Sequence, residues 1–362
     1  MSPFFLVIDV GSGGAKAFLV DASGVIVSAG ESPWDREGWS PGPGWGSIVE
    51  AVRSVINKGE HGAKDIEAVT VTSMREEFIL LGSDGSDVKI ELDEQSKAYG
   101  ERVLEEHGER MYDLSGHWPV PNWIAGAVLP WMLRERHGLD DVHHFLMLAD
   151  WVVYRLTGVA CTEGSNACES ALYDVRRNDW AWDLIDDLSL PISIFPDVKK
   201  SGEPVDTVSR EASRETGIQP GTLVVAGGAD TQCGLLGMGV KPGEAGAVGG
   251  TTTPVLTVTE VPMIDPLRRL WTNVHVEDGR WTLESNAGFT GRSMKWLNSF
   301  MASDEGHDAL NHDAGLVPPG SNGLLTYLGA HVFDSGPPYW KHDRLGNRNV
   351  PPTITGKRGF SR

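Results

Sequence analysis

Short runs of alternating apolar and polar residues open the chain. Over residues 3–30 the apolar positions recur with a period of two, which is typical of half-buried strands. A glycine-rich turn at residues 11–14 separates two of these runs, so the region predicts a meander of strands. Further strands are predicted over residues 67–72, 78–81, 145–148, 222–226, 246–248 and 254–258.

Helical spacing of apolar residues alternates with these strands. Ile48, Val52 and Val55 fall on one face of a helix predicted over residues 46–57. The same spacing predicts helices over residues 93–107, 124–137, 150–156 and 231–238. Strands and helices that alternate along the chain indicate an α/β fold.

A change of pattern suggests where one domain ends. Four prolines interrupt the pattern between residues 190 and 220, and strands then resume around new Gly- and Thr-rich loops. We therefore expect two domains, residues 1–220 and 221–362. Each half opens with strands around a Gly/Ser/Thr loop, which fits two similar domains that flank a cleft.

Composition narrows the class of protein. The chain has 362 residues and a net charge of −19, which argues against nucleic acid as a partner. It has no apolar run of about 18 residues and no basic, apolar leader, so neither a membrane nor secretion is expected. Cys161, Cys168 and Cys233 form no Cys-x-x-Cys pair and are interpreted as reduced thiols of a cytoplasmic protein.

The first glycine-rich turn is a candidate phosphate loop. Gly11 and Ser12 would direct N–H groups and a hydroxyl toward one point, and Lys16 would add a cation. Asp9, just before the turn, is placed to hold Mg²⁺ through water. No Gly-Lys-Ser/Thr follows the glycines and the next run is a strand, which excludes a P-loop and a Rossmann fingerprint. The alternative is a plain β-hairpin whose glycines serve only the turn.

Asp230 is the candidate catalytic base. It follows a strand and a Gly227-Gly228 turn and precedes a helix, and phosphoryl transfer to a hydroxyl needs a carboxylate that accepts the proton. The alternative is an N-cap, for which Asp is favoured without any chemistry. Downstream, Gly250, Thr251 and Thr252 would form a second phosphate loop, or else an ordinary hairpin turn.

The order and spacing of these motifs resemble the FGGY carbohydrate kinases, within the actin, hexokinase and Hsp70 class of ATP-binding proteins. Asp9-x-Gly-Ser with Lys16, Gly-Gly-x-Asp230 and Gly250-Thr-Thr are similar to its first phosphate, catalytic-base and second phosphate motifs. The run Ser73-Met74-Arg75-Glu76 looks most like the autoinducer-2 kinase branch.

The resemblance implies two ribonuclease H-like domains, ATP and Mg²⁺ as cofactors, and a small sugar, polyol or autoinducer-2-like substrate. By the same resemblance Asp9 would hold Mg²⁺ through water and Asp230 would deprotonate the substrate hydroxyl. Arg75 and Glu76 would line the sugar pocket, although an ion pair is the competing interpretation of Arg75. The phosphates would be bound by Gly11, Ser12, Lys16, Gly250, Thr251 and Thr252.

Two departures from the family pattern change the expectation. Gln95 stands where the family usually has an Asp that holds the substrate, so polyol recognition should be altered. No Gly-Gly-Gly adenosine motif follows the second phosphate loop, so the second domain is expected to be incomplete. The alternative function is therefore a catalytically inactive, truncated remnant or a regulatory binding protein of the same fold, and an incomplete domain makes a homodimer possible.

Overall fold

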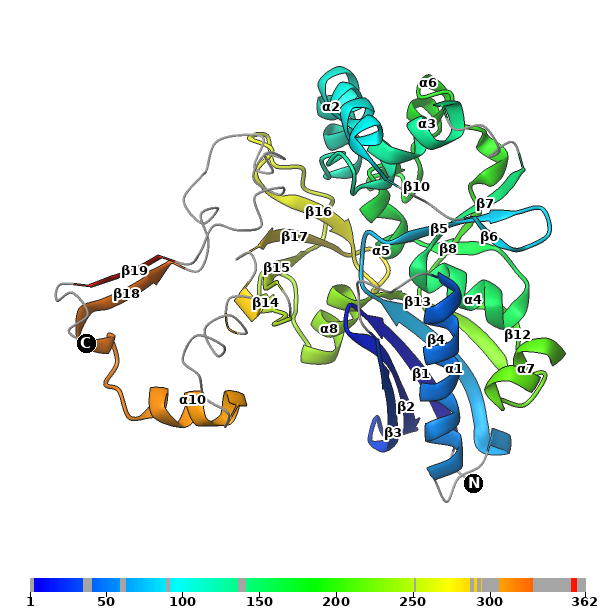
Figure 1. The fold of residues 1–362 in the computed structure, drawn as a ribbon, viewed down its shortest axis with the longest axis horizontal. Helices are drawn as coiled ribbons and strands as arrows, with labels where there is room; N and C mark the ends of the chain where they lie inside the picture. Colours follow the sequence, from blue (N-terminus) through cyan, green and yellow to red (C-terminus); the bar gives the residue numbers. More distant parts are fainter. Residues whose placement is uncertain are drawn as a thin grey trace.

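A six-stranded sheet forms the base of the molecule (Figure 1). The computed structural model describes residues 3–34, 41–58, 63–88, 92–135, 141–250, 252–286, 290–291, 294, 306–327 and 353–356. In spatial order the sheet contains β12 (Pro204–Thr207), β13 (Leu223–Ala229), β4 (Ile66–Ser73), β1 (Phe4–Gly11), β2 (Gly14–Asp21) and β3 (Ile26–Pro33). The predicted N-terminal meander is confirmed as β1, β2 and β3.

The three central strands β13, β4 and β1 run parallel, and their register fixes where their ends meet. Asp9 of β1 and Gly228 of β13 both pair with Thr72 of β4, from opposite sides. The residues that follow these positions therefore emerge along one edge of the sheet. In open α/β sheets, ligands bind beyond the carboxyl ends of parallel strands.

Three helices pack against this sheet through one apolar core. They are α1 (Pro41–Lys58), α4 (Leu148–Thr157) and α7 (Arg210–Thr216). Ile48, Val52 and Val55 of α1 are completely buried, as the helical spacing predicts. Trp45 of α1 meets Trp151 of α4 edge to face, with ring centroids 6.1 Å apart, which closes the layer.

A second, aromatic core lies beside the sheet. It is built from α2 (Glu94–Ser115), α3 (Ala125–Glu135) and α6 (Trp182–Asp187), with the small sheet of β6 (Asp87–Val88), β5 (Phe78–Gly82) and β7 (Val142–Met147). Short elements complete this region: β8 (Cys161–Glu163), α5 (Gly164–Ala167), the 3-10 turn η3 (Cys168–Ser170), β9 (Tyr173–Asp174), β10 (Asp179–Trp180), η4 (Ile192–Ile194) and β11 (Asp197–Lys199).

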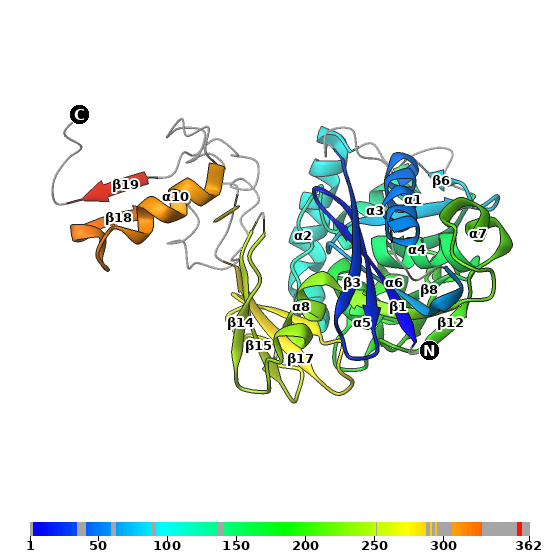
Figure 2. The ribbon, with the colours of Figure 1, turned by 90° about the horizontal axis from the view of Figure 1, so that it is seen from below.

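A four-stranded antiparallel sheet follows α8 (Asp230–Met238). Its spatial order is β14 (Ala245–Ala247), β15 (Pro254–Thr259), β17 (Trp281–Asn286) and β16 (Trp271–Val274). In Figure 2 this sheet lies beside α2 and the six-stranded sheet. The elements α10 (Gly306–Gly315), β18 (Leu324–Tyr327) and β19 (Thr353–Gly356) lie apart from both sheets. The 3-10 turns η2 (Ala63–Asp65) and η5 (Ser321–Gly323) complete the described elements.

The glycine pair before Asp230 differs from the prediction. Gly227 and Gly228 lie inside β13, not in a turn. A Cβ on Gly227 would come within 1.7 Å of the Val71 carbonyl oxygen, so only glycine lets β13 approach β4 so closely. The predicted domain boundary at residue 220 falls before β13, which pairs into the first sheet; the boundary itself stays a prediction.

Candidate active site

The predicted site residues of the first half come from three neighbouring strand ends. Asp9 lies near the end of β1, Arg75 and Glu76 follow β4, and Asp230 follows β13. Their carboxyl and guanidinium groups influence one another's pKa, which places them in one electrostatic environment. The chain thus gathers three acidic groups and one arginine at the carboxyl edge of the sheet.

Asp9 faces a cation across the hairpin. It is half-buried and pairs in register with Lys16 of β2, which is exposed. Burial and then the negative charge of Asp230 raise the pKa of Asp9, whereas Lys16 lowers it. At the start of β2 the neighbouring strand β3 comes close, because a Cβ on Gly14 would come within 2.7 Å of the Ser32 carbonyl oxygen.

Asp230 is the first residue of α8 and is half-buried. Ala229 occupies the N-cap, and no side chain caps the helix, so the N-cap interpretation of Asp230 is wrong. Its Oδ1 accepts from the backbone N–H of Thr231 at 2.6 Å and from the Thr231 hydroxyl at 3.1 Å. Burial raises the pKa of Asp230, while Arg75 and the Thr231 hydrogen bonds act against that rise. A carboxylate with a raised pKa is a stronger base than a fully solvated one.

A buried network holds the peptide that precedes Asp230. The Ala229 N–H donates to the Ser165 hydroxyl at 2.9 Å, and that hydroxyl donates to Glu163 Oε2 at 2.5 Å. Glu163 also accepts from the Ser201 hydroxyl at 2.8 Å. The position of Asp230 is therefore held by the hydrogen bonds of Ala229, Ser165 and Glu163 as well as by its own helix α8.

Glu76 has the most perturbed environment of these acids. Its φ of 72° lies in the left-handed region, which is uncommon outside glycine and concentrates at functional sites. Burial raises the pKa of Glu76 to about 7 against the opposing effect of Arg75; Glu284, Glu77 and Asp230 add to the rise. Strain and a displaced pKa together make Glu76 a functional-site candidate.

Arg75 is engaged by two buried carboxylates. Its Nη1 lies 3.0 Å from Glu169 Oε1 and 2.5 Å from Glu284 Oε2, and its Nη2 lies 2.8 Å from Glu284 Oε1. Only 9% of its side chain is exposed. Burial lowers the pKa of Arg75, but the two carboxylates outweigh that effect and raise it. The ion-pair interpretation of Arg75 is confirmed, and because Glu284 lies on β17 the pair joins the two main sheets.

The residues predicted for the second phosphate loop, and Gln95, make no contact in the structure that tests their roles. Gly250 is exposed, and its N–H donates to the Thr252 carbonyl at 2.9 Å. Thr252 is half-buried, and Thr251 lies outside the described residues. Gln95 is exposed in the first turn of α2, where its backbone N–H donates to the capping Asp93. The roles predicted for these residues stay predictions.

The donor set at the strand ends suits a divalent cation. Burial and then repulsion by Asp230 raise the pKa of Asp9, and a cation between the two carboxyl groups would relieve that repulsion. Hard oxygen donors are what Mg²⁺ prefers. The described residues therefore fit the magnesium that the motif pattern implies.

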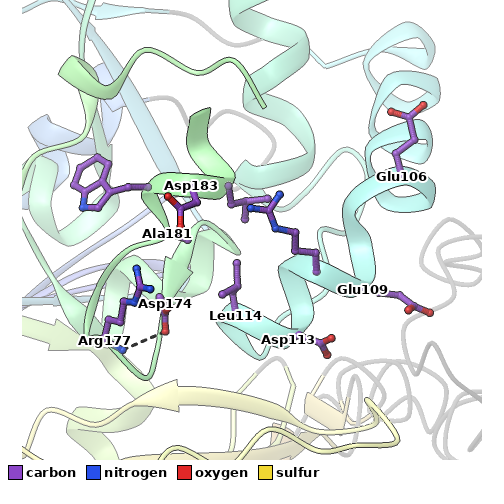
Figure 3. Close-up of a pocket in the computed structure, with 11 residues that line it drawn as sticks. Glu106, Glu109, Asp113, Leu114, Asp174, Arg177, Ala181 and Asp183 are labelled. Atoms are coloured by element: carbon purple, nitrogen blue, oxygen red, sulfur yellow. Dashed lines mark hydrogen bonds and ion pairs between the residues drawn. The ribbon is translucent and has the colours of Figure 1, made fainter. Parts of the chain in front are cut away.

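A surface pocket elsewhere has a different character. Figure 3 shows it between α2 and the β9–α6 segment, with an ion pair between Arg177 and Asp174 at 3.6 Å. Its lining includes five acidic residues: Glu106, Glu109, Asp113, Asp174 and Asp183. An acid-rich lining repels phosphate, so this pocket does not suit a nucleotide.

Sequence reasoning missed Glu169 and Glu284 as partners of Arg75. Both are buried acids in otherwise apolar or small-residue segments, and a buried carboxylate needs a partner. That composition was a usable signal, but nothing in the sequence indicates which arginine each would meet.

Two solved structures that share this fold are sugar kinases. A gluconate kinase from Lactobacillus acidophilus superposes with a TM-score of 0.80 at 18% identity, covering 100% of this chain and 73% of that one. A ligand-bound xylulose kinase from Lactobacillus acidophilus gives a TM-score of 0.80 at 18% identity, over 98% of this chain and 72% of that one. The fold is thus the two-domain α/β fold of the sugar kinases, and the chain covers the second domain only in part.

The family follows from the sequence match. The model of the N-terminal domain of the FGGY family of carbohydrate kinases matches residues 4–237, and the chain belongs to this family. Among curated relatives, the autoinducer-2 kinase of Escherichia coli (strain K12) is 28% identical over 347 residues. The match covers 89% of this chain and 66% of that kinase, so the chain spans just under two thirds of the relative's length.

No helix in the described segments has the length and apolar character needed to cross a membrane.

Proposed function

We propose that this chain phosphorylates a hydroxyl of a small sugar, polyol or autoinducer-2-like substrate with ATP. The observation that carries the proposal is the meeting of Asp9 and Asp230 at the ends of β1 and β13, close enough for Asp230 to raise the pKa of Asp9. Phosphoryl transfer to a hydroxyl requires a carboxylate that holds Mg²⁺ near the phosphates and a second carboxylate that accepts the hydroxyl proton. Asp9 and Asp230 are proposed for these two roles.

In this proposal Asp230 accepts the proton of the substrate hydroxyl. The hydroxyl oxygen then bonds to the γ-phosphorus, the bond between that phosphorus and the β–γ bridging oxygen breaks, and ADP leaves. The Thr231 N–H and hydroxyl hold one oxygen of Asp230, which leaves the other free to take the proton. The Ser165–Ala229 hydrogen bond keeps the base in position.

The first hairpin would bind the triphosphate. Gly11 and Ser12 offer backbone donors, and Lys16 offers an exposed cation beside Asp9. Gly250, Thr251 and Thr252 are proposed for the opposite side of the phosphate chain. Mg²⁺ held by Asp9 would neutralise charge on the transferred phosphoryl group.

Glu76 is the strongest candidate for a sugar contact in this scheme. A carboxyl group with a pKa of about 7 can donate a hydrogen bond when protonated and accept one when ionised. Arg75 is proposed to orient Glu76 and Asp230 through its charge, because its own donors engage Glu169 and Glu284. Gln95 is proposed to contact a substrate hydroxyl without supplying charge.

An inactive binding protein of the same fold is the second candidate. It is favoured by Gln95, which stands where the family usually has the Asp that holds the substrate, so substrate recognition should be altered. This candidate predicts weak ATP binding and no turnover.

Calorimetry and a kinase assay separate the two candidates. Mg-ATP is titrated into the 362-residue chain, and ADP release is followed with pentuloses, polyols and autoinducer-2. The kinase candidate predicts micromolar affinity for Mg-ATP and turnover of one of these substrates, whereas the inactive candidate predicts weaker binding and no turnover. Micromolar affinity together with turnover of one sugar would exclude the inactive protein.

The cellular location and the self-association of the protein are also proposals. We propose a cytoplasmic location, because Cys161, Cys168 and Cys233 are all free thiols. We propose self-association through the exposed apolar side chains at the end of α8, where Leu236 is 54% and Met238 is 50% exposed. Sedimentation of the wild type and of Leu236→Ser/Met238→Ser tests the second point, and an unchanged distribution would exclude this surface.

A further inference from the structure

Three buried side chains of the kinds that bind metal ions lie close together, and one of them, Glu169, pairs with Arg75. His117 follows α2, while Cys168 and Glu169 form the start of η3; all three are completely buried. One ligand atom from each lies within 4.8 Å of the other two. The proposed phosphate chemistry uses none of these atoms.

Asn273 determines which nitrogen of His117 carries the proton. Asn273 Nδ2 lies 3.4 Å from Glu284 Oε2, so the amide nitrogen faces an acceptor and Oδ1 faces His117. His117 Nε2 lies 2.6 Å from that Oδ1, and two acceptors cannot pair, so Nε2 bears the hydrogen. The neutral ring then presents a bare lone pair at Nδ1.

That lone pair faces a second acceptor without a donor between them. His117 Nδ1 and Glu169 Oε2 are 3.7 Å apart, and neither has a hydrogen-bond partner among the described residues. Two buried acceptors that face each other cost free energy unless a proton or a cation lies between them. The arrangement therefore calls for a positive species at this point.

The separation of His117 Nδ1 and Glu169 Oε2 suits a tetrahedral ion. Two ligands about 2.1 Å from a zinc ion lie about 3.4 Å apart, close to the separation of the two acceptors. A ligating histidine almost always donates its other N–H to an oxygen acceptor, as His117 does to Asn273. The other oxygen of Glu169 is held by Arg75 at 3.0 Å, which orients the carboxylate toward the histidine.

Charge balance supports a divalent ion. Arg75 contributes one positive charge against the two carboxylates of Glu169 and Glu284. When Cys168 binds as a thiolate there are three negative charges, which a divalent cation and Arg75 neutralise together. A divalent cation therefore offsets negative charge whose burial carries a large desolvation penalty.

We propose that His117 Nδ1, Cys168 Sγ and Glu169 Oε2 bind one zinc ion, with water as a fourth ligand. Nitrogen, sulfur and carboxylate together match zinc, whereas Mg²⁺ prefers oxygen alone. The ion would join η3 to the end of α2 and, through Glu169, support the Arg75–Glu284 pair between the sheets. Binding releases the Cys168 thiol proton to solvent.

Metal content tests the proposal on the whole chain. After incubation with zinc chloride and desalting, we expect about one zinc per chain. His117→Ala and Cys168→Ser should each reduce that content about tenfold. A strong chelator should lower the melting temperature of the zinc-loaded wild type by about 5 °C or more.

A cysteine control keeps the test decisive if those variants do not fold. In Cys161→Ala/Cys233→Ala, Cys168 is the only cysteine, so a cobalt-loaded sample should still show the thiolate-to-cobalt charge-transfer absorption. Absence of that absorption, or a wild type that takes up no metal, would overturn the proposal. A proton on Glu169, shared with His117 Nδ1, would then explain why these two acceptors face each other. Equal zinc in His117→Ala and wild type would overturn the proposal as well.

Discussion

At the scale of single residues, Asp230 and Glu76 show how burial adjusts acids for chemistry. Both carry a raised pKa caused first by burial, and Arg75 opposes the rise in each. The balance leaves Asp230 a base of increased strength. It leaves Glu76 able to change protonation near neutral pH.

Replacing Asp230 should remove turnover and leave the fold intact. In any preparation with measurable kinase activity, Asp230→Asn should lower kcat by roughly two to four orders of magnitude, because the proton acceptor is lost. Stability should change little, since Asp230 does not cap α8. The exposed Asp206→Asn is the control, and an unchanged kcat in a folded Asp230→Asn protein would identify another base.

Glu76 should make stability depend on pH. Its folded pKa of about 7 exceeds the ordinary 4.5, so its contribution to stability is complete below pH 4.5 and is lost as the pH rises through 7. Glu76→Gln has no such titration. Its unfolding free energy relative to wild type should therefore rise by on the order of 1–3 kcal/mol between pH 4.5 and 8.

Urea unfolding at both pH values measures this difference. Glu67→Gln, at an exposed position of β4, serves as the control. A difference between Glu76→Gln and wild type that does not vary with pH would show that Glu76 does not titrate as described.

At the scale of elements, the approach of β13 to β4 sets the position of the sheet edge from which Asp230 emerges. Gly227 permits backbone contact that any side chain would block, and Gly228 packs against Val276, Ser165 and Cys233. The glycine pair thus serves the packing of two parallel strands. Asp230 is positioned because it directly follows strand β13, and no separate turn lies between the strand and this residue.

Replacing Gly227 and Gly237 by alanine, one at a time, distinguishes a glycine needed for close strand packing from one that only lowers helix propensity. Gly227→Ala should destabilise the protein by about 3 kcal/mol or more, because its Cβ would overlap the Val71 carbonyl. Gly237→Ala, on α8 with open space around the Cβ position, should stabilise by up to about 1 kcal/mol. Thermal melts of both variants check the pair; similar melting temperatures would contradict the strand geometry.

At the scale of the whole molecule, the Arg75–Glu284 ion pair links the two main sheets. Arg75 follows β4 of the first sheet and Glu284 lies on β17 of the second. Breaking an isolated buried pair costs about 3–5 kcal/mol, and the loss of Glu284 should cost less because Arg75 keeps its contact with Glu169. The contact therefore controls how firmly the second sheet holds to the first.

Glu284→Gln should loosen the second sheet more than the first. Hydrogen exchange over residues 245–286 should speed up, while exchange over β1 and β4 should change less. The double variant Arg75→Met/Glu284→Gln should recover none of the lost stability, because removing Arg75 leaves the buried Glu169 without its cationic partner. Uniform exchange throughout the chain in Glu284→Gln would argue against a local link between the sheets.

The sequence by itself determined the α/β class, most strands and helices, and the acids at the strand ends. Period-two and helical spacing follow from local backbone geometry, so β1, β2, α1 and α8 could be located without tertiary information. The family motifs singled out Asp9 and Asp230, and in the structure Asp230 influences the pKa of Asp9.

Only the tertiary structure decided which groups meet. The pairing of Arg75 with Glu169 and Glu284, the left-handed backbone of Glu76 and the facing acceptors of His117 and Glu169 join residues up to 209 positions apart. Such contacts depend on strand register and on burial, which set local dielectric and hydrogen-bond partners. No periodicity in the sequence encodes them, because each arises where separate elements pack together.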